Sequence, residues 1–325
     1  MLRVMNLKTV SPNVGEDELY EACKVCNSRC LKHLYTSKRL GLPIVRCVAC
    51  GLTFVGKVVS KEEQLAIYSN QESYRAFAAT ERSVPEVSGR HLEWLAQIQS
   101  AAGLPGGRAR ASQGMPRLLD IGCGAGDFLA AAAQHGFEIH GMDVSAAAAE
   151  LAAEWHGIHV DVRQIDDDPR DNFFDVVTLI GVLEHVLDPK STLAHAHRLL
   201  APSGIMFVYT PVWGAYDALA SFAARATGGS VARPIDRRIN MAHLQILSKR
   251  TITTMLQEHG MTMLKYEAVC EYNLPIRHYL QSLGIISLRC QSAAAALAKF
   301  LIDRKLFFRN NMRVLAQKAQ QTSPA

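Results

Sequence analysis

The stretch LLDIGCGAGDF, residues 118–128, decides the fold. A short apolar run leads into glycines at positions 122, 124 and 126, and a helix-favouring segment follows. Glycines in such a turn let the chain bend tightly and let the backbone approach a ligand closely. The pattern therefore predicts a strand, a ligand-binding loop and a helix in succession. A dinucleotide site and a plain glycine-rich turn have the same local pattern.

A carboxylate follows at the distance that a nucleotide site requires. Asp143 lies 21 residues after Gly122, at the end of the next apolar segment. In that place a carboxylate accepts hydrogen bonds from both ribose hydroxyls. A dehydrogenase would show the same two features, so the class of enzyme depends on the rest of the chain.

Strand and helix signals alternate after the glycine-rich stretch 103–116. We expect strands at residues 117–121, 137–143, 159–162, 174–180 and 205–210, and helices at residues 127–135, 146–156, 190–200 and 248–259. This alternation predicts an α/β fold, a parallel sheet with helices on both faces. Ligands of such sheets bind outside the carboxyl ends of the strands. Asp127 is expected to cap the helix after the glycine loop.

Five of the eight cysteines lie between residues 23 and 50. Four of them form two Cys-x2-Cys pairs, Cys23 with Cys26 and Cys47 with Cys50, with twenty residues between the pairs. Two such loops present four thiolates to one ion, which predicts a structural Zn²⁺ site without an open coordination position. Cys30 is an alternative ligand in place of Cys23 or Cys26. Reduced thiols in a small apolar subdomain are the other interpretation.

Several segments resemble, in order, the motifs of class I S-adenosylmethionine-dependent methyltransferases: LLDIGCGAG, GMDVS, FFDVVTLIGVLEHVLDP, IMFVYTP and LQEHGM. They are most similar to the branch that has Glu-His-Val after the fourth strand. The similarity covers about residues 117–270, and residues 47–54 resemble the zinc-binding segment before this domain in glycan and natural-product pathways. The resemblance implies a Rossmann-like α/β fold with a seven-stranded sheet, a small N-terminal zinc ribbon and S-adenosyl-L-methionine as cofactor.

The resemblance also implies which residues hold the cofactor. The glycine loop and the acid before it would surround the methionine part, the acid at the end of the next strand would bind the ribose, and residues 164–166 would border the adenine. The implied contacts are Asp120, Gly122, Cys123, Gly124, Gly126, Asp143, Ile165 and Asp166. For Cys123 the alternative is a small residue chosen for fit.

Methyl transfer to a hydroxyl requires close alignment of the nucleophile and removal of its proton. Glu184 and His185 follow the strand at residues 174–180, and His243 precedes the last expected helix. A histidine titrates near neutral pH, which suits a general base. We therefore expect Glu184, His185 and His243 to be catalytic. Capping a helix or shaping the cofactor pocket is the alternative for the first two.

The chain divides into three expected parts: a zinc ribbon at residues 1–60, connecting helices and a linker at residues 61–116, and the methyltransferase domain at residues 117–325. Residues 211–247 and 271–310 are expected on the acceptor side, because each follows the carboxyl end of a strand. The second of these segments requires residues 311–318 to form a final antiparallel strand. Its apolar and basic stretch, residues 284–308, predicts a lid helix or, alternatively, contact with a membrane surface or an acyl chain.

The acceptor class follows from what stands after the fourth strand. Enzymes of this fold that methylate amino groups of bases usually carry an Asn/Asp-Pro-Pro-aromatic run there, whereas this chain has Ile-Gly-Val-Leu-Glu-His at residues 180–185. We expect a hydroxyl of a small molecule, a sugar or a lipid-linked glycan. Sugar carbon methyltransferases fit less well, since they carry a further large domain. An RNA methyltransferase, with His33, Tyr35 and Phe54 stacking on bases, and a non-catalytic binding module are the alternatives.

Composition excludes several classes of protein. With 49% apolar and 20% charged residues among 325, the chain is neither disordered nor collagen-like. Neither an uninterrupted apolar run of about 18 residues nor a secretion signal is evident, so we expect the reducing cytoplasm. The net charge of +5 is uneven: residues 22–60 and 277–325 each carry +7, which leaves −9 for the rest. Two basic segments predict an anionic acceptor.

Overall fold

A computed structural model describes residues 18–68, 71–103, 114–271 and 308–320, together with residues 292, 295–297, 300 and 304. Most of the expected insertion at residues 271–310 lies outside the described residues, and with it most of the stretch on which the lid and membrane interpretations depend. Within the described part of the chain, none of the helices has the length and apolar character needed to cross a membrane.

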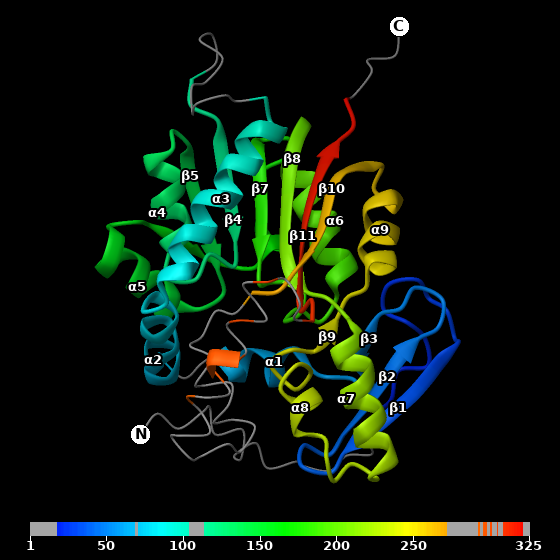
Figure 1. The fold of residues 1–325 in the computed structure, drawn as a ribbon. Coiled ribbons are helices and arrows are strands. Elements are labelled where there is room, and N and C mark those ends of the chain that lie inside the picture. The colour runs from blue at the N-terminus through cyan, green and yellow to red at the C-terminus, as the bar shows by residue number, and fades with distance from the viewer. Residues whose placement is uncertain are drawn as a thin grey trace, which may run out of the picture.

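The larger of two sheets has seven strands in the order β10-β11-β8-β7-β4-β5-β6 (Figure 1). Its strands are β4 (Arg117–Ile121), β5 (Glu138–Asp143), β6 (Val160–Val162), β7 (Phe174–Ile180), β8 (Leu200–Pro211), β10 (Met261–Val269) and β11 (Asn311–Lys318). Neighbouring strands are parallel, except that β11 runs antiparallel to both β8 and β10. The seven-stranded α/β sheet and its final antiparallel strand are therefore confirmed.

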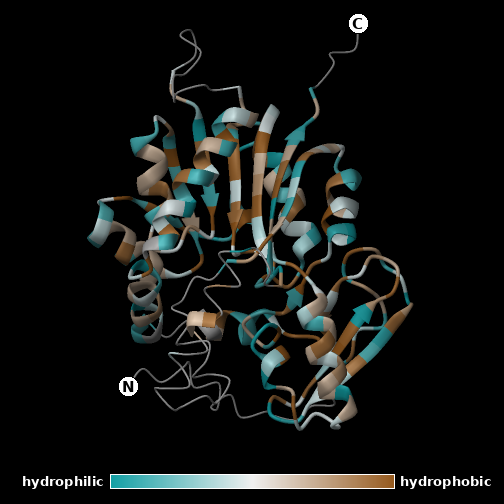
Figure 2. Cartoon of the chain, viewed as in Figure 1, coloured by the Kyte–Doolittle hydropathy of each residue, from teal (hydrophilic) through white to brown (hydrophobic). Residues whose placement is uncertain are grey.

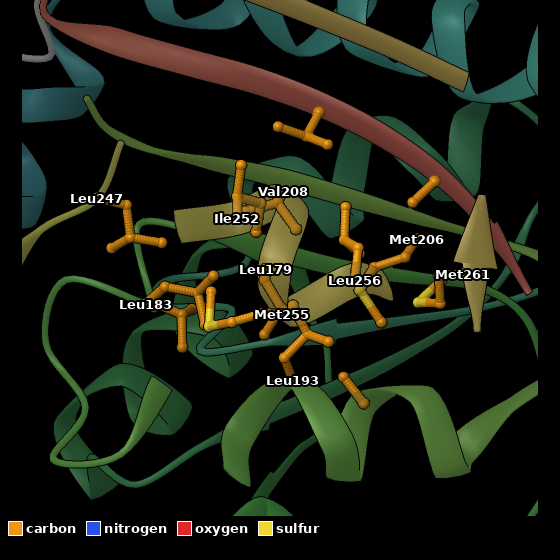
Figure 3. Packing of buried hydrophobic residues seen from close by; sticks show 14 of the residues in the cluster. Leu179, Leu183, Leu193, Met206, Val208, Leu247, Ile252, Met255, Leu256 and Met261 are labelled. Atoms are coloured by element: carbon orange, nitrogen blue, oxygen red, sulfur yellow. The ribbon is translucent and has the colours of Figure 1, made fainter. Parts of the chain in front are cut away.

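Helices cover both faces of this sheet, and the central strands β7 and β8, which are buried on both faces, are mostly apolar (Figure 2). The helices of one face are α3 (Pro85–Ala101), α4 (Asp127–Gln134) and α5 (Ala146–His156), and those of the other face are α6 (Pro189–Leu199) and α9 (Lys249–Glu258). Successive strand residues point to opposite faces of the sheet. Leu118 therefore packs in a first core under α3, α4 and α5, and Leu119 packs in a second core under α6 and α9. Figure 3 shows part of the second core, where Leu193 of α6 and Met255 of α9 meet Leu179 of β7.

The helices expected between the ribbon and the linker form, but they pack on the sheet domain. They are α1 (Lys61–Tyr68), α2 (Gln71–Arg82) and α3. Trp94 of α3 stacks on Tyr209 of β8 with ring centroids 4.6 Å apart. Arg75 of α2 forms ion pairs with Glu150 and Glu154 of α5. These contacts bring α2 to the carboxyl edge of the sheet.

The smaller sheet joins two segments that are far apart in the sequence. Its antiparallel strands are β1 (Leu31–Ser37), β2 (Leu42–Cys47), β3 (Thr53–Val55) and β9 (Gln245–Ile246). We call residues 18–60 the cysteine ribbon. β9 belongs to the segment at residues 211–247, which also forms α7 (Ala215–Ala226) and α8 (Arg233–Asp236) beside the ribbon (Figure 1). The ribbon and this acceptor-side segment thus build one unit.

A shared core explains why the two segments pack together. Tyr35 and Ile44 of the ribbon share one apolar cluster with Ala224 of α7 and Ile235 of α8. Tyr35 and Phe54 are only 2% and 0% exposed, so neither ring has the exposed face that the RNA-methyltransferase alternative requires for stacking on bases. Tyr35 lies in the cluster shared with α7 and α8, and Phe54 lies in the cluster that also holds Cys47 and Leu52.

Candidate functional site

A pocket of about 990 Å³ opens at the carboxyl ends of the parallel strands. It lies where β4 and β7 are neighbours, although the chain forms β5 and β6 between them. Open α/β sheets bind ligands at such a switch point. The pocket brings together Asp120, Gly122, Cys123, Gly124, Asp143, Ile165, Asp166, Glu184, His185 and His243. Gly126 does not line it.

The glycine loop after β4 is held in a conformation that needs glycine. Gly122, Gly124 and Gly126 have φ values of +69°, +56° and +81°. A Cβ at Gly122 would lie 2.7 Å from Val182 Cγ2, and one at Gly126 would lie 3.3 Å from Ala152 of α5. Gly122 therefore allows the Val182 side chain to lie against the loop, Gly124 allows the Tyr74 hydroxyl to do so, and Gly126 allows α4 and α5 to pack closely.

Asp143 ties the glycine loop to the end of β5. Its Oδ2 accepts a hydrogen bond from the Gly124 N–H at 3.0 Å, and its Oδ1 accepts one from the Ser145 N–H at 2.8 Å. Each carboxylate oxygen has a second lone pair, so the group can also accept from ligand hydroxyls. Burial raises the pKa of Asp143, against the effect of these backbone donors.

Asp120 is the one acid of β4. It is 2% exposed and lines the pocket together with the glycine loop and Asp143. Burial is the main reason that the pKa of Asp120 rises to about 7, and the nearby Asp143 adds to it. The Thr178 hydroxyl donates to Asp120 Oδ1 and opposes this shift. A cationic ligand beside Asp120 would favour the charged carboxylate.

Ile165 and Asp166 lie on a short 3-10 helix, η2 (Ile165–Asp167), and both line the pocket. Burial raises the pKa of the Cys123 thiol, which makes this side chain a neutral part of the lining. Asp127 does not cap α4, contrary to our expectation: Gly126 occupies the capping position. Asp127 is the first helical residue, and its carboxylate pairs with His156 Nε2 at 2.9 Å.

Glu184 and His185 lie in the turn after β7, which spans residues 181–188. Glu184 is 4% exposed, its Oε2 accepts from the Thr210 hydroxyl at 2.8 Å, and burial raises its pKa. His185 Nδ1 lies 2.7 Å from the Ala242 carbonyl oxygen. A carbonyl only accepts, so Nδ1 carries the proton and the Nε2 lone pair remains basic. Neither residue caps α6, because Asp188 does so.

His243 packs edge-on against the His185 ring, with centroids 4.6 Å apart. Burial, followed by the charges of His185 and Arg238, holds the pKa of His243 well below its usual range. His243 is therefore a neutral neighbour of His185 at physiological pH. This arrangement gives His185 a polar partner on one side of its ring.

The opposite end of the pocket is basic and aromatic. Arg237, Arg238 and Arg309 line it together with Tyr216 and Phe308. The rings of Tyr216 and Phe308 lie 6.1 Å apart. Asp217 balances Arg238, at 2.9 Å between Oδ1 and Nε. Three arginines thus line this end, whereas Asp120 and Asp143 lie beside the glycine loop.

The four paired cysteines form one cluster, with their sulfur atoms all within 4.8 Å of one another. The Cys23–Cys50 and Cys26–Cys47 sulfurs are 3.5 Å apart. Four sulfurs around a tetrahedral Zn²⁺ lie about 3.8 Å apart, so the cluster fits such an ion. Cys30 is exposed and lies outside the cluster, which removes it as a ligand here.

Sequence reasoning missed several residues that shape the site. Tyr74 of α2 lies over the glycine loop, with its hydroxyl oxygen 3.1 Å from the position of a Cβ on Gly124. Thr210 orients Glu184, and Gln245 contacts the turn that carries His185. Tyr74 and Gln245 belong to no short motif, and Thr210 lies within IMFVYTP without any signal that it contacts Glu184; only the fold brings the three to this region. An amphipathic pattern in α2 is the one local signal for Tyr74.

Comparisons with known proteins agree with this architecture. A family model for the methyltransferase domain matches residues 74–266, more than half of the chain. "Ubiquinone biosynthesis O-methyltransferase" of Pseudomonas aeruginosa is 40% identical over 132 residues, which are 38% of this chain and 52% of that protein. The protein of the same name from Pasteurella multocida is 30% identical over 145 residues, 40% of this chain and 55% of that protein. The chain thus spans about half the length of the curated relatives it matches.

A solved structure supports the same fold. Phosphoethanolamine N-methyltransferase 2 of Haemonchus contortus, in complex with S-adenosyl-L-methionine, aligns over 82% of this chain and 62% of that one. The TM-score is 0.53 at 17% sequence identity, a likeness of fold alone. With the seven-stranded sheet, the glycine loop and the family match together, the chain belongs to the methyltransferase domain family.

Proposed function

We propose that the protein transfers a methyl group from S-adenosyl-L-methionine to a hydroxyl of a small-molecule acceptor. One observation carries the proposal: a single pocket joins the glycine loop and Asp143 at one end to His185 at the carboxyl edge of β7. Family membership supports the cofactor class. The names of the curated relatives, which are O-methyltransferases, support an oxygen nucleophile.

The cofactor would occupy the acidic end of the pocket. Gly122 and Gly124 leave room for its methionine part, and Asp143 accepts from the ribose hydroxyls. Cys123, Ile165 and Asp166 border the adenine. Asp120 offers a carboxylate to a positively charged ligand. Gly126 acts indirectly, because it lets α4 begin close to α5.

The catalytic step needs a base near the acceptor hydroxyl. When bound, the cofactor supplies an electrophilic methyl group. The Ala242 carbonyl fixes the His185 tautomer with the proton on Nδ1, so Nε2 takes the hydroxyl proton. Glu184 Oε1 lies 3.9 Å from that nitrogen and stabilises the imidazolium that forms. His243 packs against the ring and limits its rotation.

The acceptor is an anion in this proposal. Arg237 and Arg309 at the far end of the pocket match a phosphate or carboxylate, and Tyr216 with Phe308 matches an apolar or sugar ring. A sugar or lipid-linked glycan with a diphosphate has both properties. The burial of Tyr35 and Phe54 disfavours RNA as the acceptor, since these rings have no exposed face for a base.

The cysteine cluster would hold a structural Zn²⁺. All four cysteines are at least partly buried and each offers one sulfur, which leaves no position for substrate. The thiols must remain reduced, as they do in the cytoplasm. Metal analysis should give about one zinc per chain, and much less in Cys47→Ser/Cys50→Ser. Equal, low zinc in both proteins would contradict the assignment.

Transfer of a labelled methyl group tests the function. The protein is incubated with methyl-labelled S-adenosylmethionine and fractionated anionic metabolites of its host, and labelled products are identified by mass spectrometry. We expect an O-methylated anion with wild-type protein and none with His185→Ala. Tight cofactor binding without any labelled product in any fraction would favour the non-catalytic module. Label in RNA would redirect the acceptor class.

A further inference from the structure

The cysteine ribbon contacts the turn that carries Glu184 and His185, through Gln245 of β9. Gln245 is 0% exposed, and its Nε2 donates to the Leu183 carbonyl at 2.6 Å and to the Val186 carbonyl at 2.7 Å. One side-chain amide thus spans both sides of the two catalytic candidates. A buried amide that uses both of its N–H groups in this way holds the turn in one conformation.

Backbone N–H groups of residues 244 and 245 also form hydrogen bonds with this turn. The Leu244 N–H donates to the Glu184 carbonyl at 2.8 Å, and the Gln245 N–H approaches it at 3.4 Å. The Gln64 amide of α1 donates to the His185 carbonyl. All four consecutive carbonyls of residues 183–186 therefore accept hydrogen bonds from outside the turn. Three of them depend on residues 244 and 245.

The ribbon sets the orientation of the Gln245 amide. Lys24 Nζ donates to Gln245 Oε1 at 2.7 Å. A lysine ammonium only donates, so Oε1 must face Lys24 and Nε2 must face the carbonyls. Lys24 lies between Cys23 and Cys26, and the Asn27 N–H closes this loop onto the Cys23 carbonyl. The cysteine cluster thereby fixes the position of the Lys24 backbone.

β9 also belongs to the ribbon sheet. Gln245 pairs with Phe54 of β3, and three residues upstream the Ala242 carbonyl accepts from His185 Nδ1. A shift of this segment would move the acceptor that selects the His185 tautomer. The path runs from the cysteine loop through Lys24 and Gln245 to the turn, and every step is a hydrogen bond or a strand pair.

We propose that the cysteine ribbon is a positioning element of the methyl-transfer site, acting through Lys24 and Gln245 on the turn that carries Glu184 and His185. The inference rests on the proposed function for the role of His185. Lys24 and Gln245 are positioning residues and touch neither cofactor nor acceptor. Their effect is to hold the turn so that the His185 ring keeps its proton on Nδ1 and Nε2 stays unprotonated.

Nitrogen NMR of the histidine rings tests the proposal in the full chain without any ligand, so the outcome does not depend on methyl transfer. The His185 signals are assigned by their loss in His185→Gln. In wild-type protein we expect one neutral tautomer with the proton on Nδ1. In Lys24→Met we expect a mixture of the two tautomers, with at least a twofold loss of the Nδ1-protonated form.

Two further variants make the result decisive. Lys32→Met removes an exposed lysine of β1 and should leave the His185 signals unchanged. The single variant Gln245→Met should show a larger loss of the Nδ1-protonated form than Lys24→Met does. If the buried Gln245 variant does not fold, the result for Lys24→Met decides. Wild-type tautomer and chemical shifts in folded Lys24→Met would overturn the proposal. If wild-type protein does not bind S-adenosylmethionine, that result would instead contradict the proposed function.

Discussion

The two ends of the pocket are built in different ways. The cofactor end takes its side chains from residues 120–166, which form β4, β5, η2 and the loops between them. The acceptor end combines the turn after β7, α7, α8, the segment with Ala242 and His243, and residues 308–311. Local sequence therefore specifies the glycine loop and Asp143, although the tertiary fold adds Tyr74 of α2 over that loop, whereas the acceptor end is assembled by the tertiary fold throughout. The ribbon acts on the second end alone.

The ends also differ in charge. Asp120 and Asp143 lie beside the glycine loop, and Arg237 and Arg309 lie at the opposite end. Opposite fields favour a cationic ligand at the first and an anionic ligand at the second. The methyl group would pass between them, at His185. If this contrast is correct, substitutions at each end should affect one ligand and spare the other.

The largest effect is expected at the junction of the two ends. His185→Ala removes the proposed base and should lower turnover by about 10²- to 10⁴-fold. Cofactor affinity should change less than about threefold, since the glycine loop is intact. Steady-state kinetics and calorimetry check the two numbers. Unchanged turnover would remove His185 from the mechanism.

At the cofactor end, Asp143→Ala should weaken S-adenosylmethionine binding by about 100-fold. The variant loses the acceptor of two backbone N–H groups and of the ribose hydroxyls, and charged hydrogen bonds of this kind are strong. Calorimetric titration measures the change. Arg309→Gln, a matched substitution at the other end, should bind the cofactor like wild type; equal losses in both variants would abolish the distinction between the ends.

Asp120 predicts a pH dependence of cofactor binding. With its pKa near 7, the free site holds a proton below that pH, and a bound cation favours release of this proton. Affinity should therefore fall as the pH drops below 7, approaching about tenfold per unit. Without cofactor, the raised pKa means that the unfolding free energy falls as the pH rises from about 4 to 7. Asp120→Asn should flatten both profiles, and a slope that persists in this variant would exclude Asp120 as its source.

At the acceptor end, Arg237→Gln/Arg309→Gln should raise the KM for the anionic acceptor by about tenfold and reduce its dependence on salt. The turnover number should change little, because neither arginine is the proposed base. Arg233→Gln is the control, since Arg233 is exposed and lies outside the pocket lining. A KM that is the same in all three proteins would argue against an anionic acceptor.

The sequence predicted the strand, the glycine loop and the nearby Asp143 for a physical reason. The strand, the glycine turn and Asp143 interact over some twenty residues, and positive φ values at Gly122 and Gly124 are required by the turn itself. The alternation of strands and helices is a local signal too, and it predicted the parallel strands. The resemblance to the methyltransferase family predicted the seven-stranded sheet with its antiparallel last strand, which is β11. The spacing of the four cysteines likewise predicted their cluster.

The acceptor end was predicted only in part. Glu184, His185 and His243 were candidates because they follow or precede regular elements, but Gln245 and Lys24 carry no such signal. They lie 221 residues apart and meet only because β9 joins the ribbon sheet. Asp127 failed as a cap because Gly126 already occupies that place with a left-handed backbone. Burial decided against Tyr35 and Phe54 as stacking groups, and periodicity does not show which strand face is covered.

A crystal structure with bound S-adenosylhomocysteine tests the central claim most directly. We predict the homocysteine part along Gly122 and Gly124, the ribose hydroxyls within about 3 Å of the Asp143 carboxylate, and the sulfur facing His185. The basic end beyond His185 should remain open to an acceptor. A nucleoside bound away from the glycine loop, or no bound nucleoside at millimolar ligand, would contradict the account.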